Sequence, residues 1–258
     1  SYYFAGNSYL KVRWRNLRLD MKTVKGIMTI GVSQFLRAVA DCIAGFLLVK
    51  MVSVHGGDVG LSAFSIVQRI MIFSTIPGNV LAQAMQPILG FNYGARRFRQ
   101  ALKTINMVII ITTALGVTML IALLLLAKPV VSLFTNDPGI ISATTTAARI
   151  TLLGIPVYGF FNVGQLAFPS IGKVLPTLLI SVLRPLIGMA ALTLILPQFF
   201  QLNGVWMVFP GSDVVGTSLV LAFFIPMVRM FRKQIKEQER TGGDIRISGP
   251  QLDTGAPT

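Results

Sequence analysis

Residues 86–97 read Gln-Pro-Ile-Leu-Gly-Phe-Asn-Tyr-Gly-Ala-Arg-Arg, a basic turn in which Gly90 and Gly94 bracket Phe-Asn-Tyr. This turn closes one long apolar segment just before another begins at Ala101. Each flanking segment is long enough to cross a bilayer, which takes about 20 mostly apolar residues. The stretch therefore predicts a turn at a membrane surface, in a chain that crosses the lipid more than once.

The composition agrees with a membrane location. Of 258 residues, 53% are hydrophobic and 12% are charged, whereas about a quarter of the residues in a soluble domain are charged. The net charge of +14 comes from basic residues clustered between the apolar segments, which argues against a nucleic-acid partner. We expect an integral membrane protein surrounded by lipids, and the single cysteine, Cys42, excludes an intrachain disulfide.

Six long apolar runs are separated by charged or turn-rich breaks. They cover residues 26–53, 60–89, 102–127, 139–168, 174–197 and 204–229. All should be helices, because open strands leave backbone hydrogen bonds unsatisfied in lipid. The predicted fold class is an all-α integral membrane bundle of six transmembrane helices.

Basic residues set the expected orientation of these spans. They lie before the first span, in the loop between the second and third spans, in the loop between the fourth and fifth spans, and after the last span. The other face has Lys128 and at most Lys50 as well. Because cytoplasmic loops carry an excess of Lys and Arg, we expect both termini in the cytoplasm.

Three regions follow from the span boundaries. Residues 1–25 form a cytoplasmic basic linker, in which residues 1–10 look like the stub of a preceding span. Residues 26–230 form the six-helix lobe. Residues 231–258 form a cytoplasmic tail that we expect to be disordered beyond about Arg240, because it has little apolar surface to bury.

Four pieces of sequence resemble the C-terminal half of the multidrug and toxic compound extrusion (MATE) family. They are Ile30–Ser33, Gly56–Asp58, Gln86–Ala95 and Gly204–Asp213, within a matching stretch from Gly31 to Lys233. The resemblance implies two six-helix lobes that export amphipathic compounds in exchange for protons or sodium ions, through a cleft between the lobes. This chain would supply one lobe, and an N-terminal six-helix lobe would be its missing partner.

Charged side chains inside the spans are functional candidates, since each costs about 3 kcal/mol on insertion scales. They are Arg37, Asp41, Arg69, Arg149, Arg184 and Asp213. Arg37 and Asp41 are one helical turn apart, so they can form a structural pair. The other interpretation is that Asp41 couples export to an ion, and the resemblance favours it because many relatives carry an acidic residue eight positions after that of Ser33.

Some relatives also use an aspartate in the span that corresponds to residues 139–168, and this chain has none there. We therefore favour proton coupling, or coupling by the other lobe, over a sodium site in this lobe. Asp213 follows Pro210 and Gly211, which loosen the helix, and broken helices often mark binding regions in transporters. Alternatively, Asp213 pairs with Arg184 or Arg69 of a neighbouring span.

Amides form a second set of candidates for the substrate cleft, together with Arg69 and Arg184. They are Gln34, Gln68, Asn79, Gln83, Gln86, Asn162 and Gln165. Asn79, Gln83 and Gln86 repeat at spacings of four and three, so they lie on one helix face. That face should contact the cleft or another helix, not lipid.

The chain shows no nucleotide-binding loop, metal-ligand cluster or Ser/His/Asp set, so we expect no enzyme, no catalytic residue, no metal site and no cofactor beyond the coupling ion, H⁺ or Na⁺. The predicted function is half of a secondary-active multidrug or organic-cation antiporter in a bacterial or archaeal plasma membrane. The alternatives are a lipid-linked saccharide flippase of related fold, and an inactive fragment or scaffold subunit.

Overall fold

The computed structural model describes residues 21–247. The chain divides into two compact units, Ser1–Val39 and Ala40–Thr258, and the packing given below is that of the second unit. The predicted stub and most of the linker, at residues 1–20, and the end of the tail, at residues 248–258, lie outside the described residues.

The described part of the chain is built from helices and contains no strand, as the sequence predicts. The elements are α1 (Met21–Gly94), α2 (Phe98–Ser132), α3 (Pro138–Thr151), the 3₁₀ segment η2 (Leu152–Gly154), α4 (Ile155–Ser170), α5 (Val174–Leu183), the π segment η3 (Arg184–Ala191) and α6 (Leu192–Ile247). Within these residues, three continuous segments are long and apolar enough to cross a membrane: Phe98–Ser132, Pro138–Ser170 and Leu175–Arg240.

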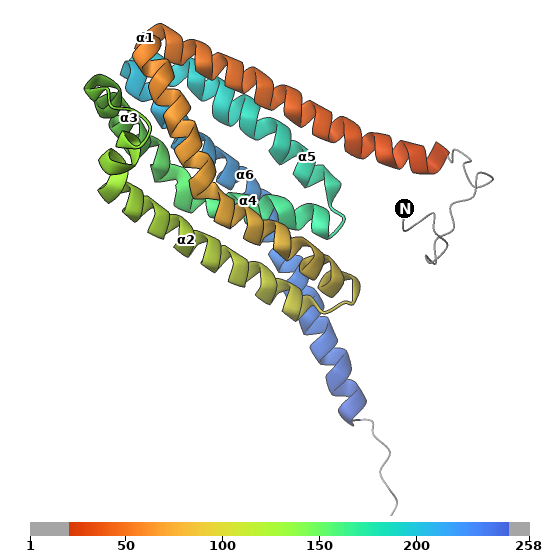
Figure 1. Cartoon of the computed structure of the whole chain (residues 1–258). Helices are drawn as coiled ribbons and strands as arrows, with labels where there is room; N and C mark the ends of the chain where they lie inside the picture. Colours follow the sequence, from red (N-terminus) through yellow and green to blue (C-terminus); the bar gives the residue numbers. More distant parts are fainter. Residues whose placement is uncertain (1–20, 248–258) are drawn as a thin grey trace, which may run out of the picture. The chain divides into compact units, whose positions relative to one another are not determined.

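Helices α1 and α6 each reverse direction at one residue with positive φ, Gly57 in α1 and Gln201 in α6. Figure 1 shows α1 turning back on itself at its labelled end. Each reversal falls between two predicted spans, so the six predicted spans correspond to six helical arms. Helix α6 continues past residue 229, where the last predicted span ends, to Ile247.

The two reversals pack against each other through small residues. A Cβ atom on Gly56 would lie 2.9 Å from Cδ1 of Leu202, and Gly60 also faces Leu202. Gly204 lies directly on the backbone of Leu196, where a side chain would collide. Small residues let the backbones approach this closely, which is how helices associate in lipid.

Two apolar clusters form the core of the second unit. One lies near the reversals and packs Leu48, Val52 and Val67 of α1 around Trp206 of α6. The other lies at the opposite end and joins residues of α1, α2, α4 and α6: Leu89, Ile105, Phe168, Met227 and Phe231. Helix α2 packs along α4, and α6 contacts α3, α4 and η3 (Figure 1).

Large apolar side chains also cover the outside of the lobe. Phe73, Ile110, Leu125 and Phe199 are each more than half exposed. Exposed apolar surface on this scale would drive a soluble protein to associate. It is the surface that a bilayer solvates.

The turn at residues 86–97 is fixed to the end of α6. The ring of Tyr93 lies 5.9 Å from that of Phe98 and 5.8 Å from that of Phe231. The side-chain amide of Gln238 donates a hydrogen bond of 2.9 Å to the carbonyl oxygen of Arg96. The turn that the sequence singles out therefore joins α1, α2 and α6 at one end of the bundle.

Gln201 has φ 49° and ψ −131°, and Gly57 has φ 55° and ψ −148°. Only glycine adopts this backbone region without strain, which costs other residues about 1–3 kcal/mol. We expect Gln201→Gly to raise the free energy of unfolding by about 1 kcal/mol and Gly57→Ala to lower it by at least as much. Unfolding in bicelles, followed by circular dichroism, measures both changes.

The matched control is Gly78→Ala, at a helical glycine where a Cβ meets no atom within 4 Å. It should be neutral or stabilising, because alanine favours helix over glycine. If all three variants change stability in the same direction, backbone conformation does not explain the two reversals.

Candidate functional site

The central feature of the site is a buried ion pair between Arg184 and Asp213. A guanidinium nitrogen of Arg184 lies 2.6 Å from Oδ1 of Asp213. The side chain of Asp213 is 5% exposed and that of Arg184 is 25% exposed. Asp213 therefore pairs with Arg184, one of its two predicted partners, whereas the other, Arg69, is exposed on α1.

Irregular helix geometry surrounds this pair. Arg184 opens the π segment η3, which contains Pro185, and a proline removes one backbone donor from the helix. Asp213 lies in α6 three residues after Pro210, but α6 stays helical through Pro210 and Gly211, and its non-helical backbone falls at Gln201 instead. π-helical geometry is rare in proteins and is found frequently at functional sites.

Two glycines leave the space that the ion pair occupies. A Cβ atom on Gly154, the last residue of η2, would collide with the carboxylate of Asp213. A Cβ atom on Gly216 would lie 2.7 Å from Cδ of Arg184. The pair therefore depends on close backbone approach from the fourth and sixth spans.

Two aromatic rings contact the guanidinium group of Arg184. The Cζ atom of Arg184 lies 4.5 Å from the ring centre of Phe161 and 5.8 Å from that of Tyr158. Both distances are within the range of a cation–π contact. The Nε atom of Arg184 is buried and makes no hydrogen bond within the described residues, so this N–H remains available to a further acceptor.

A hydrogen-bonded amide group adjoins the ion pair. Oδ1 of Asn79 accepts a bond of 2.6 Å from Nδ2 of Asn162 and one of 3.2 Å from the hydroxyl of Tyr158. Tyr158 thus contacts both Asn79 and Arg184. We call these five residues the polar cluster: Asn79, Tyr158, Asn162, Arg184 and Asp213.

The polar cluster gathers four of the residues predicted from sequence and adds Tyr158. Tyr158 was missed because a tyrosine in an apolar run is ordinary, although its position one turn before Asn162 places it on the same face of α4. Gln165, also predicted, is buried elsewhere and donates a 3.0 Å bond to Ser181 of α5.

The other predicted residues do not join the cluster. Gln68 and Gln86 are partly buried on α1, and Gln83 is exposed there. Arg37 and Asp41 are exposed on the first arm of α1, with Arg37 in the first compact unit and Asp41 in the second. The side chain of Gln34 lies outside the described residues.

The fold and the buried charges define one lobe of a helical membrane transporter, and comparison with known proteins gives the family. The MatE family model matches residues 35–194. The chain belongs to this family, the MATE transporters, which are membrane transporters and not enzymes.

Curated proteins also match the chain in sequence. The chain is 22% identical over 232 residues to the multidrug export protein MepA of Staphylococcus haemolyticus, covering 89% of this chain and 48% of that protein. It is 21% identical over 227 residues to MepA of Staphylococcus aureus, covering 87% and 49%. The chain thus spans about half the length of the curated relatives it matches.

Solved structures share the fold. A crystal structure of MATE in the bent conformation matches with a TM-score of 0.80 at 21% identity, covering 90% of this chain and 52% of that one. A MOP superfamily transporter from Pyrococcus furiosus matches with a TM-score of 0.77 at 20% identity, covering 89% and 52%. The described lobe corresponds to about half of each transporter.

The coupling between Arg184 and Asp213 can be tested by comparing the stability changes of the two single variants with that of the double variant. Removing one partner of a buried pair leaves an uncompensated charge and costs about 3 kcal/mol or more, whereas removing both costs far less. We expect Asp213→Asn and Arg184→Met each to lower the free energy of unfolding by about 3 kcal/mol, and the double variant to lose less than either. The measurement is equilibrium unfolding in bicelles.

Lys233 and Glu237 serve as the control pair, because their side chains are exposed and 3.8 Å apart. Exposed pairs contribute about 0–1 kcal/mol, so their variants should be nearly additive. Additive losses at Arg184 and Asp213 would contradict a coupled buried pair.

Proposed function

We propose that this chain is one six-helix lobe of a secondary-active multidrug antiporter, which exports amphipathic organic cations in exchange for H⁺ or, alternatively, Na⁺. Membership of the MatE family supports this function. So does the similarity to MepA, named as a multidrug export protein, over 89% of the chain. These relatives favour drug export over the lipid-linked saccharide flippase.

The observation that carries the proposal is the buried Arg184–Asp213 pair inside the last two spans. A charge at that depth is costly unless it is paired, and intramembrane carboxylates mark ion pathways. The pair contacts Tyr158, and through it Asn79, so helices from the second, fourth, fifth and sixth spans meet at one charged point. A proton or cation bound at Asp213 would alter all of these contacts.

Export against a gradient requires the ion and the drug each to bind one access state better than the other. We assign the exposed Asp41 on α1 to the ion-coupling face, with Arg37 as its neighbour in sequence. Asp213 acts inside the lobe, where its pairing with Arg184 depends on the charge of the carboxylate. The exposed Gln83 and Arg69 remain candidates for contact with substrate.

The complete transporter needs a second lobe, because the chain spans 48% of MepA from Staphylococcus haemolyticus. In our proposal the drug path runs between the two lobes, with lipid around them. An inactive fragment or scaffold subunit remains the alternative, and it predicts that the charged residues tolerate neutral replacement. No enzymatic step, metal or organic cofactor is part of the proposal.

We propose that the protein resides in the plasma membrane of a bacterium or archaeon. Both of its termini would lie in the cytoplasm. The basic turn at residues 95–97 and the end of α6 lie at one end of the bundle, since Gln238 bonds to Arg96. Basic residues concentrate at this end, which supports its cytoplasmic location. The reversals at Gly57 and Gln201 would then face outward.

Cysteine labelling tests this topology. In a Cys42→Ser background, Gly57→Cys and Asp137→Cys should react with an impermeant maleimide added outside, and Arg96→Cys should react only after the membrane is opened. All three positions are exposed in the lobe. The reverse pattern would contradict the proposed orientation.

Export assays test the coupling residues in the complete transporter that contains this lobe. We expect Asp41→Asn to abolish gradient-driven export while the protein remains in the membrane. The double variant Arg184→Met/Asp213→Asn should fold yet lose most of its dependence on the gradient. Drug efflux from vesicles with an imposed pH or sodium gradient provides the measurement.

Asp58→Asn is the matched control, because this exposed aspartate lies next to the reversal at Gly57. It should export at the wild-type rate. If Asp41→Asn also does so across a range of pH and sodium concentrations, Asp41 has no coupling role. If the double variant keeps full gradient dependence, the polar cluster is structural only.

A further inference from the structure

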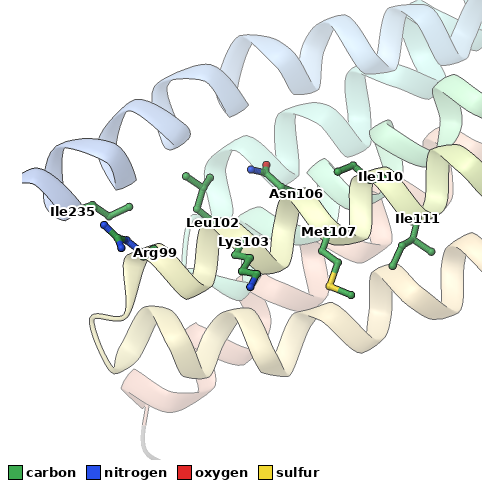
Figure 2. A pocket seen from close by; sticks show the side chains of 8 residues that line it. All are labelled: Arg99, Leu102, Lys103, Asn106, Met107, Ile110, Ile111 and Ile235. Atoms are coloured by element: carbon green, nitrogen blue, oxygen red, sulfur yellow. The ribbon is translucent and has the colours of Figure 1, made fainter.

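A surface groove runs along α2 to Ile235 of α6, and none of its lining residues belongs to the polar cluster. Its volume is about 510 Å³. Eight residues line it: Arg99, Leu102, Lys103, Asn106, Met107, Ile110, Ile111 and Ile235. Figure 2 shows Lys103, Met107 and Ile111 pointing to one side of α2, with Ile235 supplied by α6.

The lining changes from basic to apolar along α2. Arg99 and Lys103 are one helical turn apart, at the end of the bundle that carries the basic turn. Met107, Ile110 and Ile111 follow them toward the middle of the span. At 1.5 Å per residue, Arg99 to Ile110 covers about 16 Å of helix, roughly half the hydrocarbon thickness of a bilayer.

The basic end of the groove carries excess positive charge. Arg99 pairs with Glu239 of α6, but an arginine has further N–H groups to donate. Lys103 has no ion-pair or hydrogen-bond partner in the part of the chain that the structure describes. Nearby on α6, three basic residues outnumber two acidic ones: Lys233, Lys236 and Arg240 against Glu237 and Glu239.

We propose that this groove binds one acidic phospholipid. Its phosphate lies between Arg99 and Lys103, and an acyl chain follows Met107 and Ile110. Met107 is 58% exposed and Ile110 is 67% exposed, so their side chains are open to such a chain. A headgroup of negative charge followed by a hydrocarbon chain matches the order of the lining residues.

The end of the groove that holds the phosphate also joins two elements. Arg99 is in α2 and its partner Glu239 is in α6, so a bound phosphate would add a third charge to the contact between them. This site needs only that the chain spans a membrane, and it is independent of the transported substrate.

A local fluorescence assay tests the site. In the Cys42→Ser chain, a bimane label at Asn106→Cys is placed in nanodiscs of neutral phosphatidylcholine with brominated phosphatidylglycerol or, separately, brominated phosphatidylcholine as quencher. We expect preferential quenching by phosphatidylglycerol. Each basic residue near an anionic lipid contributes about fivefold in affinity, so Lys103→Gln should reduce the preference about fivefold and Arg99→Gln/Lys103→Gln should nearly remove it.

Two controls use positions away from the basic end of the groove. A label at Thr118→Cys, which is exposed on the same helix, should show no preference between the two lipids. The variant Lys128→Gln/Arg149→Gln removes the same charge from a separate pocket lined by α2 and α3 and should leave quenching at position 106 unchanged. Circular dichroism confirms that each variant is folded.

Three results would overturn the proposal. The first is an unchanged preference in the Arg99→Gln/Lys103→Gln variant, and the second is an equal loss in the Lys128→Gln/Arg149→Gln variant, which would indicate general surface charge. The third is complete loss of the preference on adding inorganic phosphate, which would make the groove a site for free anions and not for a lipid.

Discussion

The structure depends on one constraint: within lipid, every backbone N–H and C=O must be bonded by the chain itself. Helices meet this requirement, and the described residues contain only helices and short turns. Many hydroxyl side chains in the helices bond to a carbonyl oxygen one turn earlier. Ser74 donates to the carbonyl of Ile70 at 2.7 Å, and Thr193 donates to that of Met189 at 2.7 Å. Polar groups that cannot be satisfied within their own helix must therefore meet across helices, and this requirement creates the polar cluster.

How much could be predicted from the sequence follows from the same constraint. The lengths of the apolar runs predicted the six membrane-spanning helical arms, because the thickness of the membrane fixes how long a span must be. Hydropathy could not give the end of α6, since Lys233 and Glu237 continue the helix outside the apolar region. The reversal at Gly57 was marked by glycine, whereas the one at Gln201 carries no such signal.

The sequence could predict most of the residues that belong to the candidate site, but not which of them contact each other. Charges and amides inside apolar spans singled out Asn79, Asn162, Arg184 and Asp213, because such groups need a partner. Periodicity places a residue on one face of its own helix, yet it does not identify the neighbouring helix. The choice between Arg184 and Arg69 as the partner of Asp213 therefore required the packing.

The polar cluster lies where the helices are least regular. Gly154 ends a 3₁₀ segment beside Asp213, and Arg184 begins a π segment. A shift of one residue in helix register rotates a side chain by about 100°, so returning η3 to α-helical register would turn Arg184 away from Asp213. While Asp213 is charged, that shift would leave a buried charge without a partner, which is strongly unfavourable. In our proposal the ion pair holds the π segment in register, and neutralising Asp213 lowers the cost of changing it. The coupling that we propose for Asp213 therefore has a definite structural element on which to act.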